Sequence, residues 1–351
     1  MPPEAPVCCL SDDRPKITIY DVARRAGVAI STVSRVLNES PDVSMETRRR
    51  VNTAIEALNF RPDRRARQLA QQGAPTLAIA MPTLTTPFHA SLLKGIRLHL
   101  RERELDLLFC DLGSRERHRA LIHFLHRGAV SGLLLVGLKV TEDIASEFKS
   151  MGAAVAILGY QHEDFDSYWW DDIEGARRAV AHLTSMGHRR IGMIRSASES
   201  RTQIRRIDGY RSALQAAGLP FDETLVAAGT TDKHAGYSEE SGYEAMGTLM
   251  ALSEPVTAVF CASDAQAMGA WLALRESGIR VPEDVAIVGY DDVKTSRYVG
   301  LSSMDQAMQQ VGELAAIRLL KRMDVELDDP PSSFCHTPEL RIRSSSAFQR
   351  G

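Results

Sequence analysis

Apolar residues recur at helical spacing in three short segments between residues 16 and 60. Thr18, with an acidic residue three positions later, is typical of a capping box, and the helix it begins is predicted to end at Gly27. A second helix is predicted from about Ser31 and a third from about Ser44. Two helices joined by a short turn that contains glycine form a helix-turn-helix. The three helices can share one small core, formed by Ile19, Val22, Ala23, Ala26, Val33, Val36, Leu37, Val51, Ile55 and Leu58.

The pattern changes after Gly73, where short apolar runs of strand length alternate with segments that have apolar residues at helical spacing. This alternation predicts parallel sheets that are covered by helices on both faces. The number of units exceeds what one compact sheet holds, so two lobes are expected, with a ligand in the cleft beyond the carboxyl ends of the strands. The predicted strands are 76–81, 105–112, 130–138, 154–160, 190–195, 258–264 and 285–292.

Composition places the chain among ordinary globular proteins, because 44% of its 351 residues are hydrophobic and 25% are charged. No apolar run approaches the roughly 20 residues of a membrane span. Residues 1–15 carry no basic region and no long apolar stretch, so we expect a disordered tail and no secretory signal. The five cysteines form no disulfide framework or metal-ligand spacing, which favours a reducing cytoplasm. The adjacent Cys8 and Cys9 lack partner histidines, which favours incidental thiols over a redox or metal device.

The net charge of −3 hides a difference between two parts of the chain. Residues 14–72 carry a net charge of +6, whereas residues 73–351 carry −6. A basic module on an acidic body is what phosphate binding by one end requires, since Lys and Arg release counterions from the DNA duplex. A solvated basic helix surface would have the same charge, so the residue pattern has to distinguish DNA binding from this alternative.

The second helix of a helix-turn-helix enters the major groove with its N-terminal residues against the base edges. Ile30, Ser31 and Arg35 are therefore the candidates for base contacts. Arg35 can bind a guanine through two hydrogen bonds, and Ile30 can contact a thymine methyl group. The remaining DNA-binding candidates in this unit are better placed for phosphates or cap the first helix: Thr18, Tyr20, Thr32, Ser34 and Asn38. A small helical bundle with solvated polar faces is the alternative.

Residues 17–72 resemble the lactose-repressor (LacI/GalR) family of bacterial transcription regulators. The stretches TIYDVARRAGV, STVSRVLN, ETRRRV and ALNFRPDRRARQLA match the pattern of that family at its spacing, without a gap. The resemblance implies a hinge helix over residues 62–73 that folds when two chains meet on the operator. Such a short helix is marginal by itself, so its folding can depend on DNA and on a partner.

Leu69 stands where the family carries the leucine that wedges into the central minor-groove step. The flanking Arg64, Arg65 and Arg67 would hold phosphates. Asp63 replaces the Asn that is usual in the family, and its negative charge is expected to weaken DNA binding while still capping a helix. An ordinary linker leucine is the alternative for Leu69.

The resemblance extends through the body, where GHRRIGMI, RRIDGYRSAL, ESGYEAM and VAIVGYDD fall in the family order. It implies the periplasmic-binding-protein fold, with a helix-turn-helix domain over 16–61 and an effector-binding and dimerisation domain over 74–351. Three chain crossings between the lobes are expected near 172–174, 301–305 and 335–337. The N-lobe would hold about 75–173 and 304–335, and the C-lobe about 174–303 and 336–346.

Two charged residues carry over from the family as the main effector contacts. Arg206, in RRIDGY, matches the arginine that holds the effector, and Asp291, the first acid of GYDD, matches the aspartate that grips vicinal hydroxyls. The pair suits a polyol, because a carboxylate accepts hydroxyl hydrogen bonds while a guanidinium donates to ring and exocyclic oxygens. An ion pair between the two lobes is the alternative for these residues.

Further effector contacts are implied at four positions. Tyr237 aligns with the aromatic residue on which the effector stacks, and Phe88 belongs to the turn that opens the first helix of the body. Ser263 replaces the asparagine usual before the aspartate of CASD, so a different pattern of effector contacts is expected. Asp172 lies at the first crossing. A surface or lid position is the alternative for Tyr237.

Two unusual segments bear on the nature of the effector. RSASES (195–200) stands where the family commonly has a small glycine-rich turn, and Arg195 pointing into the cleft would indicate an anionic effector. A solvent-facing arginine is the alternative. Trp169 and Trp170 precede the first crossing, where strand core packing is favoured over stacking on a sugar.

The sequence contains no nucleophile–base pair, metal cluster or phosphate loop, so we expect neither an enzyme nor a cofactor or metal. A sugar transport protein would have no use for residues 17–72. The sequence therefore predicts a DNA-binding regulator, a repressor by the family norm, controlled by a sugar, sugar acid or sugar phosphate. A homodimer on pseudo-palindromic operator DNA is expected, and the absence of a leucine heptad after the body favours a dimer over a tetramer. Inducer and co-repressor both stay open for the effector.

Overall fold

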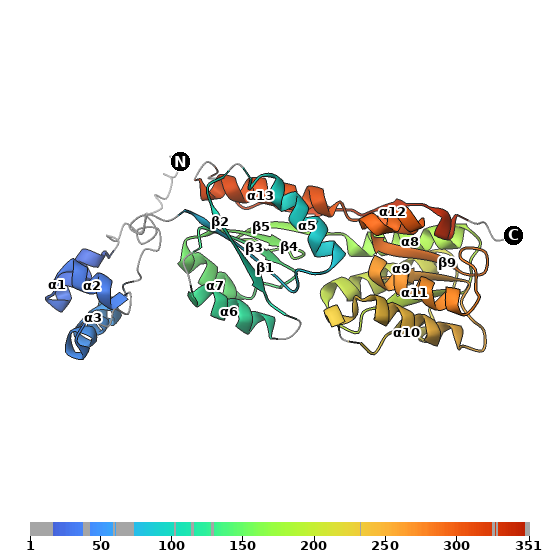
Figure 1. Ribbon diagram of the computed structural model, residues 1–351, viewed down its shortest axis with the longest axis horizontal. Coiled ribbons are helices and arrows are strands. Elements are labelled where there is room, and N and C mark those ends of the chain that lie inside the picture. The colour runs from blue at the N-terminus through green and yellow to red at the C-terminus, as the bar shows by residue number, and fades with distance from the viewer. Residues whose placement is uncertain are drawn as a thin grey trace, which may run out of the picture. The chain divides into compact units, whose positions relative to one another are not determined.

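The computed structural model describes residues 17–37, 43–58, 60, 74–101, 103–113, 116–127, 130–231, 233–324, 327 and 329–347. The chain divides into two compact units, residues 1–73 and 74–351. The described part of the first unit is helical, and the second unit contains two sheets with helices packed on them (Figure 1). Among the described residues, no helix combines the length and the apolar character that a membrane crossing requires.

The first unit consists of α1 (Ile19–Ala26), α2 (Ile30–Leu37) and α3 (Met45–Leu58). Asp21 accepts hydrogen bonds from the backbone N of Thr18 at 2.9 Å and from its Oγ1 at 2.8 Å, so the expected capping box is present. Gly27 ends α1 in a left-handed conformation with φ 63°. One side chain from each helix is fully buried in the common core, namely Val22, Val33 and Val51.

The second unit contains two six-stranded sheets, ordered β11-β5-β4-β3-β1-β2 and β12-β10-β9-β8-β6-β7. Every strand pairing is parallel except that of β10 with β12. The first sheet consists of β1 (Thr76–Met81), β2 (Asp106–Asp111), β3 (Gly132–Val136), β4 (Ala154–Leu158), β5 (Asp166–Trp170) and β11 (Ser333–His336). The second consists of β6 (Ile191–Arg195), β7 (Val226–Ala228), β8 (Ala258–Cys261), β9 (Ala286–Asp291), β10 (Ser302–Asp305) and β12 (Glu339–Arg341).

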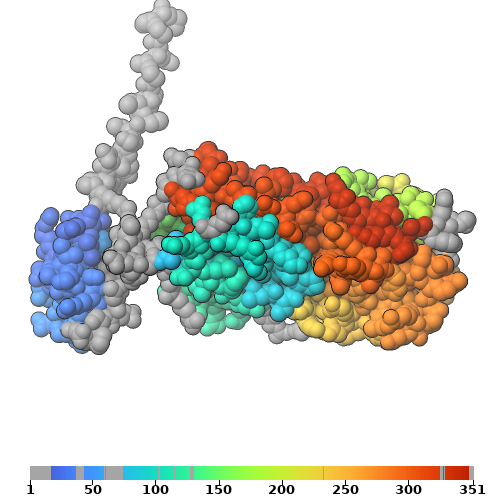
Figure 2. All heavy atoms as spheres, turned by 45° about the horizontal axis from the view of Figure 1, so that its top comes forward, coloured from blue at the N-terminus to red at the C-terminus, as the bar shows by residue number. Residues whose placement is uncertain are grey.

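Helices cover both faces of each sheet, as the strand–helix alternation predicts. On the first sheet, α5 (Pro87–Leu98) and α13 (Met308–Met323) lie side by side on one face (Figure 2). The other face is covered by α6 (Arg117–Arg127) and α7 (Glu142–Met151). On the second sheet, α8 (Asp172–Ser185) and α9 (Arg201–Ala216) cover one face. Its other face is covered by α10 (Glu239–Met250) and α11 (Asp264–Glu276), and the short α12 (Lys294–Val299) follows β9.

The chain passes between the two lobes three times. The first crossing lies between β5 and α8, the second between β10 and α13, and the third between β11 and β12. The second crossing was expected at 301–305, with the N-lobe resuming at residue 304. It lies instead after Asp305, the last residue of β10. Met304 and Asp305 pair with Tyr290 and Asp291 of β9, so they belong to the second sheet. The third crossing follows His336, which pairs with Trp170 in the first sheet rather than opening the C-lobe.

Candidate functional site

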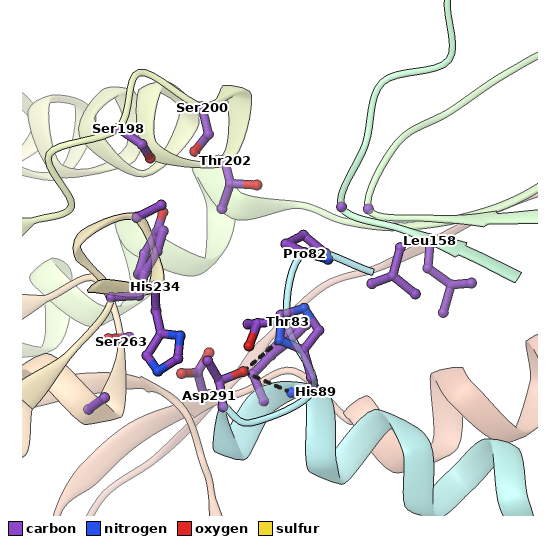
Figure 3. Close-up of a pocket in the computed structure, with 18 of the residues that line it drawn as sticks. Pro82, Thr83, His89, Leu158, Ser198, Ser200, Thr202, His234, Ser263 and Asp291 are labelled. Atoms are coloured by element: carbon purple, nitrogen blue, oxygen red, sulfur yellow. Dashed lines mark hydrogen bonds between the residues drawn. The ribbon is translucent and has the colours of Figure 1, made fainter. Parts of the chain in front are cut away.

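A cavity of about 410 Å³ lies between the two lobes, where the strands of both sheets end and the following helices begin. The first lobe contributes Pro82, Thr83, Thr86, Pro87, Phe88, His89, Asp111, Gly113, Arg117, Val136, Gly137, Leu158, Gly159, Tyr160 and Trp170. The residues from Asp172 to the second crossing contribute Asp172, Ser198, Ser200, Thr202, Arg206, His234, Ala235, Tyr237, Ser263, Ala265, Asp291, Val293 and Gln306. Figure 3 shows Ser198, Ser200 and Thr202 on one side of the cavity and Pro82, Thr83 and His89 on another.

Arg206 is held rigidly in the wall of this cavity by α9. Its Nε donates to Asp172 Oδ1 at 2.9 Å, and its guanidinium carbon lies 3.7 Å from the ring centre of Tyr290. Another guanidinium nitrogen donates to the carbonyl oxygen of Ala262. Burial disfavours the charged form, but the interactions with Asp172, Tyr290, Tyr237 and Asp291 together outweigh burial and raise the pKa of Arg206, so the guanidinium stays protonated. A fixed, charged donor is therefore present at the cavity.

Close packing of α8 against α9 brings Arg206 and Asp172 together. Gly209, one turn after Arg206, faces α8, and a Cβ atom there would lie 2.2 Å from the carbonyl oxygen of Ile173. A larger side chain at this position would push the helices apart. Asp171, which caps the N-terminus of α8, forms a second and more exposed pair with Arg205 at 3.0 Å.

Asp291 ends β9 and is buried at the cavity wall. Its Oδ1 accepts a hydrogen bond from Gln306 Nε2 at 2.6 Å, and its Oδ2 has only a long contact of 3.4 Å with the backbone N of Asp264. Burial, followed by the nearby charge of Asp264, raises the pKa of Asp291. The left-handed φ of 128° at Asp291 is costly for a residue with a side chain, and such backbone conformations cluster at functional sites.

Asp264, the first residue of α11, has a structural role. Its two carboxylate oxygens accept hydrogen bonds from Ser303 Oγ and Ser296 Oγ at 2.5 Å each and from the backbone N of Val293 at 2.9 Å. Burial raises the pKa of Asp264 to about 6. These bonds occupy Asp264 and fix the loop that carries Asp291.

The ion pair expected as an alternative for Arg206 and Asp291 is absent among the described residues. Arg206 pairs with Asp172 instead, and both Arg206 and Asp291 belong to the second lobe. Neither residue can therefore act as a direct lock between the lobes. Both are left with polar atoms at the cavity wall, which is the arrangement a ligand needs.

Aromatic residues of the first lobe form the apolar part of the cavity. Phe88 packs edge-on against Trp170, with ring centres 5.7 Å apart. Trp170 donates its Nε1 to the carbonyl oxygen of Gln306 at 2.7 Å, so this residue belongs to the core and to the cavity wall at once. Trp169 lies on the opposite face of β5, bonds to Ser333 Oγ at 3.1 Å and does not line the cavity.

Tyr237 and Ser263 line the cavity as expected, in different ways. The hydroxyl of Tyr237 is buried and has no hydrogen-bond partner in the described part of the chain, so it is available to a ligand. Ser263 caps α11 by accepting from the backbone N of Gln266 at 3.2 Å. Before Tyr237, His234 and Ala235 have left-handed φ angles of 51° and 57°, and this strained turn brings His234 to the cavity.

Arg195 does not line the cavity, which corrects the expectation that it points into the cleft. This residue ends β6 and donates to the carbonyl oxygen of Ser196 at 3.0 Å. Ser198 and Ser200 of the same segment face the cavity instead (Figure 3). The anionic-effector hypothesis therefore loses the residue on which it was based.

Five titratable residues of the cavity were not identified from the sequence: His89, Asp111, Arg117, Tyr160 and His234. They lie at a strand end, at helix starts and in connecting segments, and no motif marks them. The rule that ligands bind beyond the carboxyl ends of parallel strands could have indicated the loops, though not the individual side chains.

The first unit presents its predicted base-reading residues on one helix. Ile30, Ser31 and Arg35 of α2 are exposed, and Ile30 retains 40% of its surface despite being apolar. Tyr20 of α1 is 63% exposed, and Thr18 at the helix start is exposed as well. Thr32 and Ser34 are half-buried. The remaining predicted DNA contacts lie outside the described residues: Asn38, Asp63, Arg64, Arg65, Arg67 and Leu69.

A helix-turn-helix unit followed by two parallel-sheet lobes around a ligand-sized cavity defines a ligand-responsive transcription regulator. Residues 18–63 match the family described as bacterial regulatory proteins, lacI family, and residues 180–346 match the periplasmic binding protein-like domain. The regulator CelR of Thermobifida fusca is 34% identical over 343 residues, which cover 95% of this chain and 99% of CelR. The repressor PurR of Haemophilus influenzae (strain PittEE) is 32% identical over 337 residues, covering 93% and 98%.

Solved structures of related regulators are also similar to this chain in fold. A CelR–cellobiose complex superimposes with a TM-score of 0.67 at 32% identity, covering 95% of this chain and all of that one. The lac repressor dimer bound to operator and the anti-inducer ONPF gives a TM-score of 0.67 at 26% identity, covering 94% and 99%. This chain belongs to the LacI family of transcriptional regulators, which are not enzymes.

Proposed function

We propose that this protein is a sequence-specific repressor whose operator affinity is controlled by a sugar or sugar derivative bound between its two lobes. The observation that carries the proposal is that Arg206 and Asp291 both line one cavity to which both lobes contribute. A fixed guanidinium and a buried carboxylate can donate to and accept from neighbouring hydroxyls, while Phe88 and Trp170 offer apolar surface to a sugar ring.

Two related regulators whose structures contain a bound sugar support the proposal that the effector is a sugar. CelR has been solved with cellobiose, and a LacI family regulator from Enterococcus faecium has been solved with bound ribose, at 25% identity and a TM-score of 0.69. That second match covers 79% of this chain and all of the other. The polyol-binding groups of the cavity agree with this class of ligand.

A thermal-shift screen of the full chain against sugars, sugar acids, sugar phosphates and purines tests the effector site. A ligand at a hundred times its Kd adds about 2.7 kcal/mol to the free energy of unfolding, which raises Tm visibly. We expect Asp291→Asn to remove the shift, and the exposed control Asp208→Asn on α9 to keep it. A shift that survives in Asp291→Asn would place the effector elsewhere.

The mechanism rests on linkage between the cavity and the DNA-binding unit. Two chains would present two helix-turn-helix units to a pseudo-palindromic operator, and closure or rotation of the lobes would change the spacing of the two hinge segments (62–73). A hinge that cannot pair loses its helix and the wedge at Leu69. Coupling of about 1–3 kcal/mol alters DNA affinity roughly 5- to 150-fold, and DNA must alter effector affinity by the same factor.

The edge strand β2 supports a homodimer. Leu107, Leu108 and Phe109 are 39%, 44% and 43% exposed, although they lie in the middle of a strand. β2 ends the first sheet, so one of its sides has no neighbouring strand among the described residues. An exposed apolar edge strand promotes association with another chain, and a second copy is the partner that a two-fold operator requires.

We expect Leu108→Asp to convert the dimer to a monomer and to weaken operator binding, because a charge on this strand opposes burial. Light scattering coupled to size exclusion gives the oligomeric state. Ile342→Asp is the matched control, since Ile342 is 56% exposed but lies after β12 in the second lobe. A Leu108→Asp protein that remains dimeric would exclude β2 from the interface.

A further inference from the structure

The charged groups of the cavity fall into two sets. Arg206, Asp172 and Asp291 of the second lobe influence one another. Arg117, at the start of α6, and Asp111, at the end of β2, influence His89 instead. The proposed polyol contacts belong to the first set, so the second set has no assigned role.

Arg117 is the central residue of the second set. It is half-buried at the cavity wall, and its Nε donates to the carbonyl oxygen of Gly113 at 3.0 Å. Within the described ranges no carboxylate lies within 4 Å of its guanidinium, so its charge is not neutralised by an ion pair. Burial lowers the pKa of Arg117, yet arginine stays protonated in proteins. A partly desolvated cation without a counter-charge is unfavourable unless a ligand supplies one.

The surroundings of Arg117 are electropositive. Burial, followed by repulsion from Arg117 and His234, lowers the pKa of His89 to about 4, so His89 is neutral at pH 7. The N-termini of α5 and α9 also reach the cavity through their capping residues Thr86 and Ser200, and helix N-termini favour anions.

One acidic residue opposes this field. Asp111 is exposed at the end of β2, and its Oδ1 accepts a hydrogen bond from the backbone N of Gly113 at 2.8 Å. Asp111 forms no ion pair with Arg117 in the described structure. The guanidinium therefore keeps donors that are free for a ligand.

We propose that the cavity binds an anionic effector, whose phosphate or carboxylate lies beside Arg117 while its hydroxyls contact Asp291 and Arg206. The inference rests on the proposed function and specifies its ligand class as a sugar phosphate or a sugar acid. It also moves the anion contact from Arg195, which lies outside the cavity, to the first lobe. A ligand held at one end by each lobe would stabilise the closed arrangement.

Matched ligands on one sugar skeleton test the proposal. Isothermal titration of the full chain with glucose, glucose 6-phosphate and glucuronate, with the analogous series from ribose, and with inorganic phosphate separates the neutral ring from its anion. We expect one anionic member to bind at least about tenfold more tightly than its neutral parent, as a charge-assisted hydrogen bond allows. Whether the sugar phosphate or the sugar acid shows this higher affinity tells which anionic group the cavity binds. Arg117→Gln should remove this gain, whereas Arg119→Gln, an exposed arginine on the same helix, should keep it.

Asp111→Asn is a second test, because the two kinds of ligand predict opposite changes in effector affinity. If an anion lies beside Arg117, removing the Asp111 charge strengthens binding several-fold; if the same residues hold neutral sugar hydroxyls, it weakens binding. A neutral sugar that binds as tightly as its anionic forms and is unaffected by Arg117→Gln would overturn the proposal and leave the proposed function standing. The proposal would also be overturned if none of these anions, inorganic phosphate included, bound detectably to the wild type or to Arg117→Gln. Absence of specific operator binding both with and without these ligands would instead contradict the proposed function.

Discussion

Replacement of Arg206 by alanine should abolish effector binding and lower the free energy of unfolding by about 3–5 kcal/mol, the cost of breaking a buried ion pair. Only 5% of the Arg206 side chain and 9% of the Asp172 side chain are exposed. The substitution leaves Asp172 with an uncompensated charge and the carbonyl of Ala262 without its donor. Urea denaturation measures the loss of stability, and calorimetry at a temperature where the variant is folded measures the loss of effector binding.

Two further variants separate the charge of Arg206 from its geometry. Arg206→Lys keeps the charge but loses the planar donor set, so we expect most of the stability to return while effector affinity stays low. Arg205→Ala breaks the neighbouring pair with Asp171, whose side chains are 24% and 33% exposed, and should cost less than about 1 kcal/mol. An Arg206→Ala protein as stable as Arg205→Ala, with intact effector binding, would contradict the assigned role.

Replacement of Leu69 by alanine should weaken binding to the specific operator at least tenfold more than binding to unrelated DNA. Leu69 lies outside the described residues, so this prediction rests on the sequence. An apolar wedge is used only where the DNA is kinked, a deformation that costs a few kcal/mol per base step and is repaid by added contacts. Nonspecific binding depends on phosphates and has no use for the wedge.

Arg67→Ala is the matched comparison for Leu69→Ala. Loss of a phosphate contact should weaken specific and nonspecific binding about equally, and it should lower the slope of log affinity against log salt by about 1. Fluorescence anisotropy on both DNAs over a range of salt concentrations measures each effect. Equal losses on both DNAs for Leu69→Ala would exclude the wedge.

Elements with strong apolar periodicity and local capping signals were predictable from the sequence. Thr18 and Gly27 mark the ends of α1, and the seven apolar runs correspond to strands because buried parallel strands have continuous apolar character. β10 (Ser302–Asp305) was not predicted as a strand, and β5 (Asp166–Trp170) was expected in a strand only at Trp169 and Trp170. Their polar residues are buried by specific partners, as when Asp166 accepts from Arg318 at 2.7 Å, and such partners are remote in sequence.

The candidate site was predictable only where a motif marks it. Arg206 and Asp291 stand in motifs of the family, and both line the cavity. Arg117 and His234 both line the cavity because the two lobes bring distant segments of the chain together, and no local sequence pattern predicts this arrangement. The expectation for Arg195 failed because the turn after β6 directs Ser198 and Ser200, rather than the last residue of the strand, toward the cavity.

Operator affinity of the full chain, measured with and without the effector identified by the thermal-shift screen, tests the central claim most directly. The account predicts that saturating effector changes the operator Kd by a factor of about 5–150, and that saturating operator changes the effector Kd by the same factor. The change should vanish in Asp291→Asn. An effector that binds the cavity and leaves operator affinity unchanged would contradict the claim that this cavity controls DNA binding.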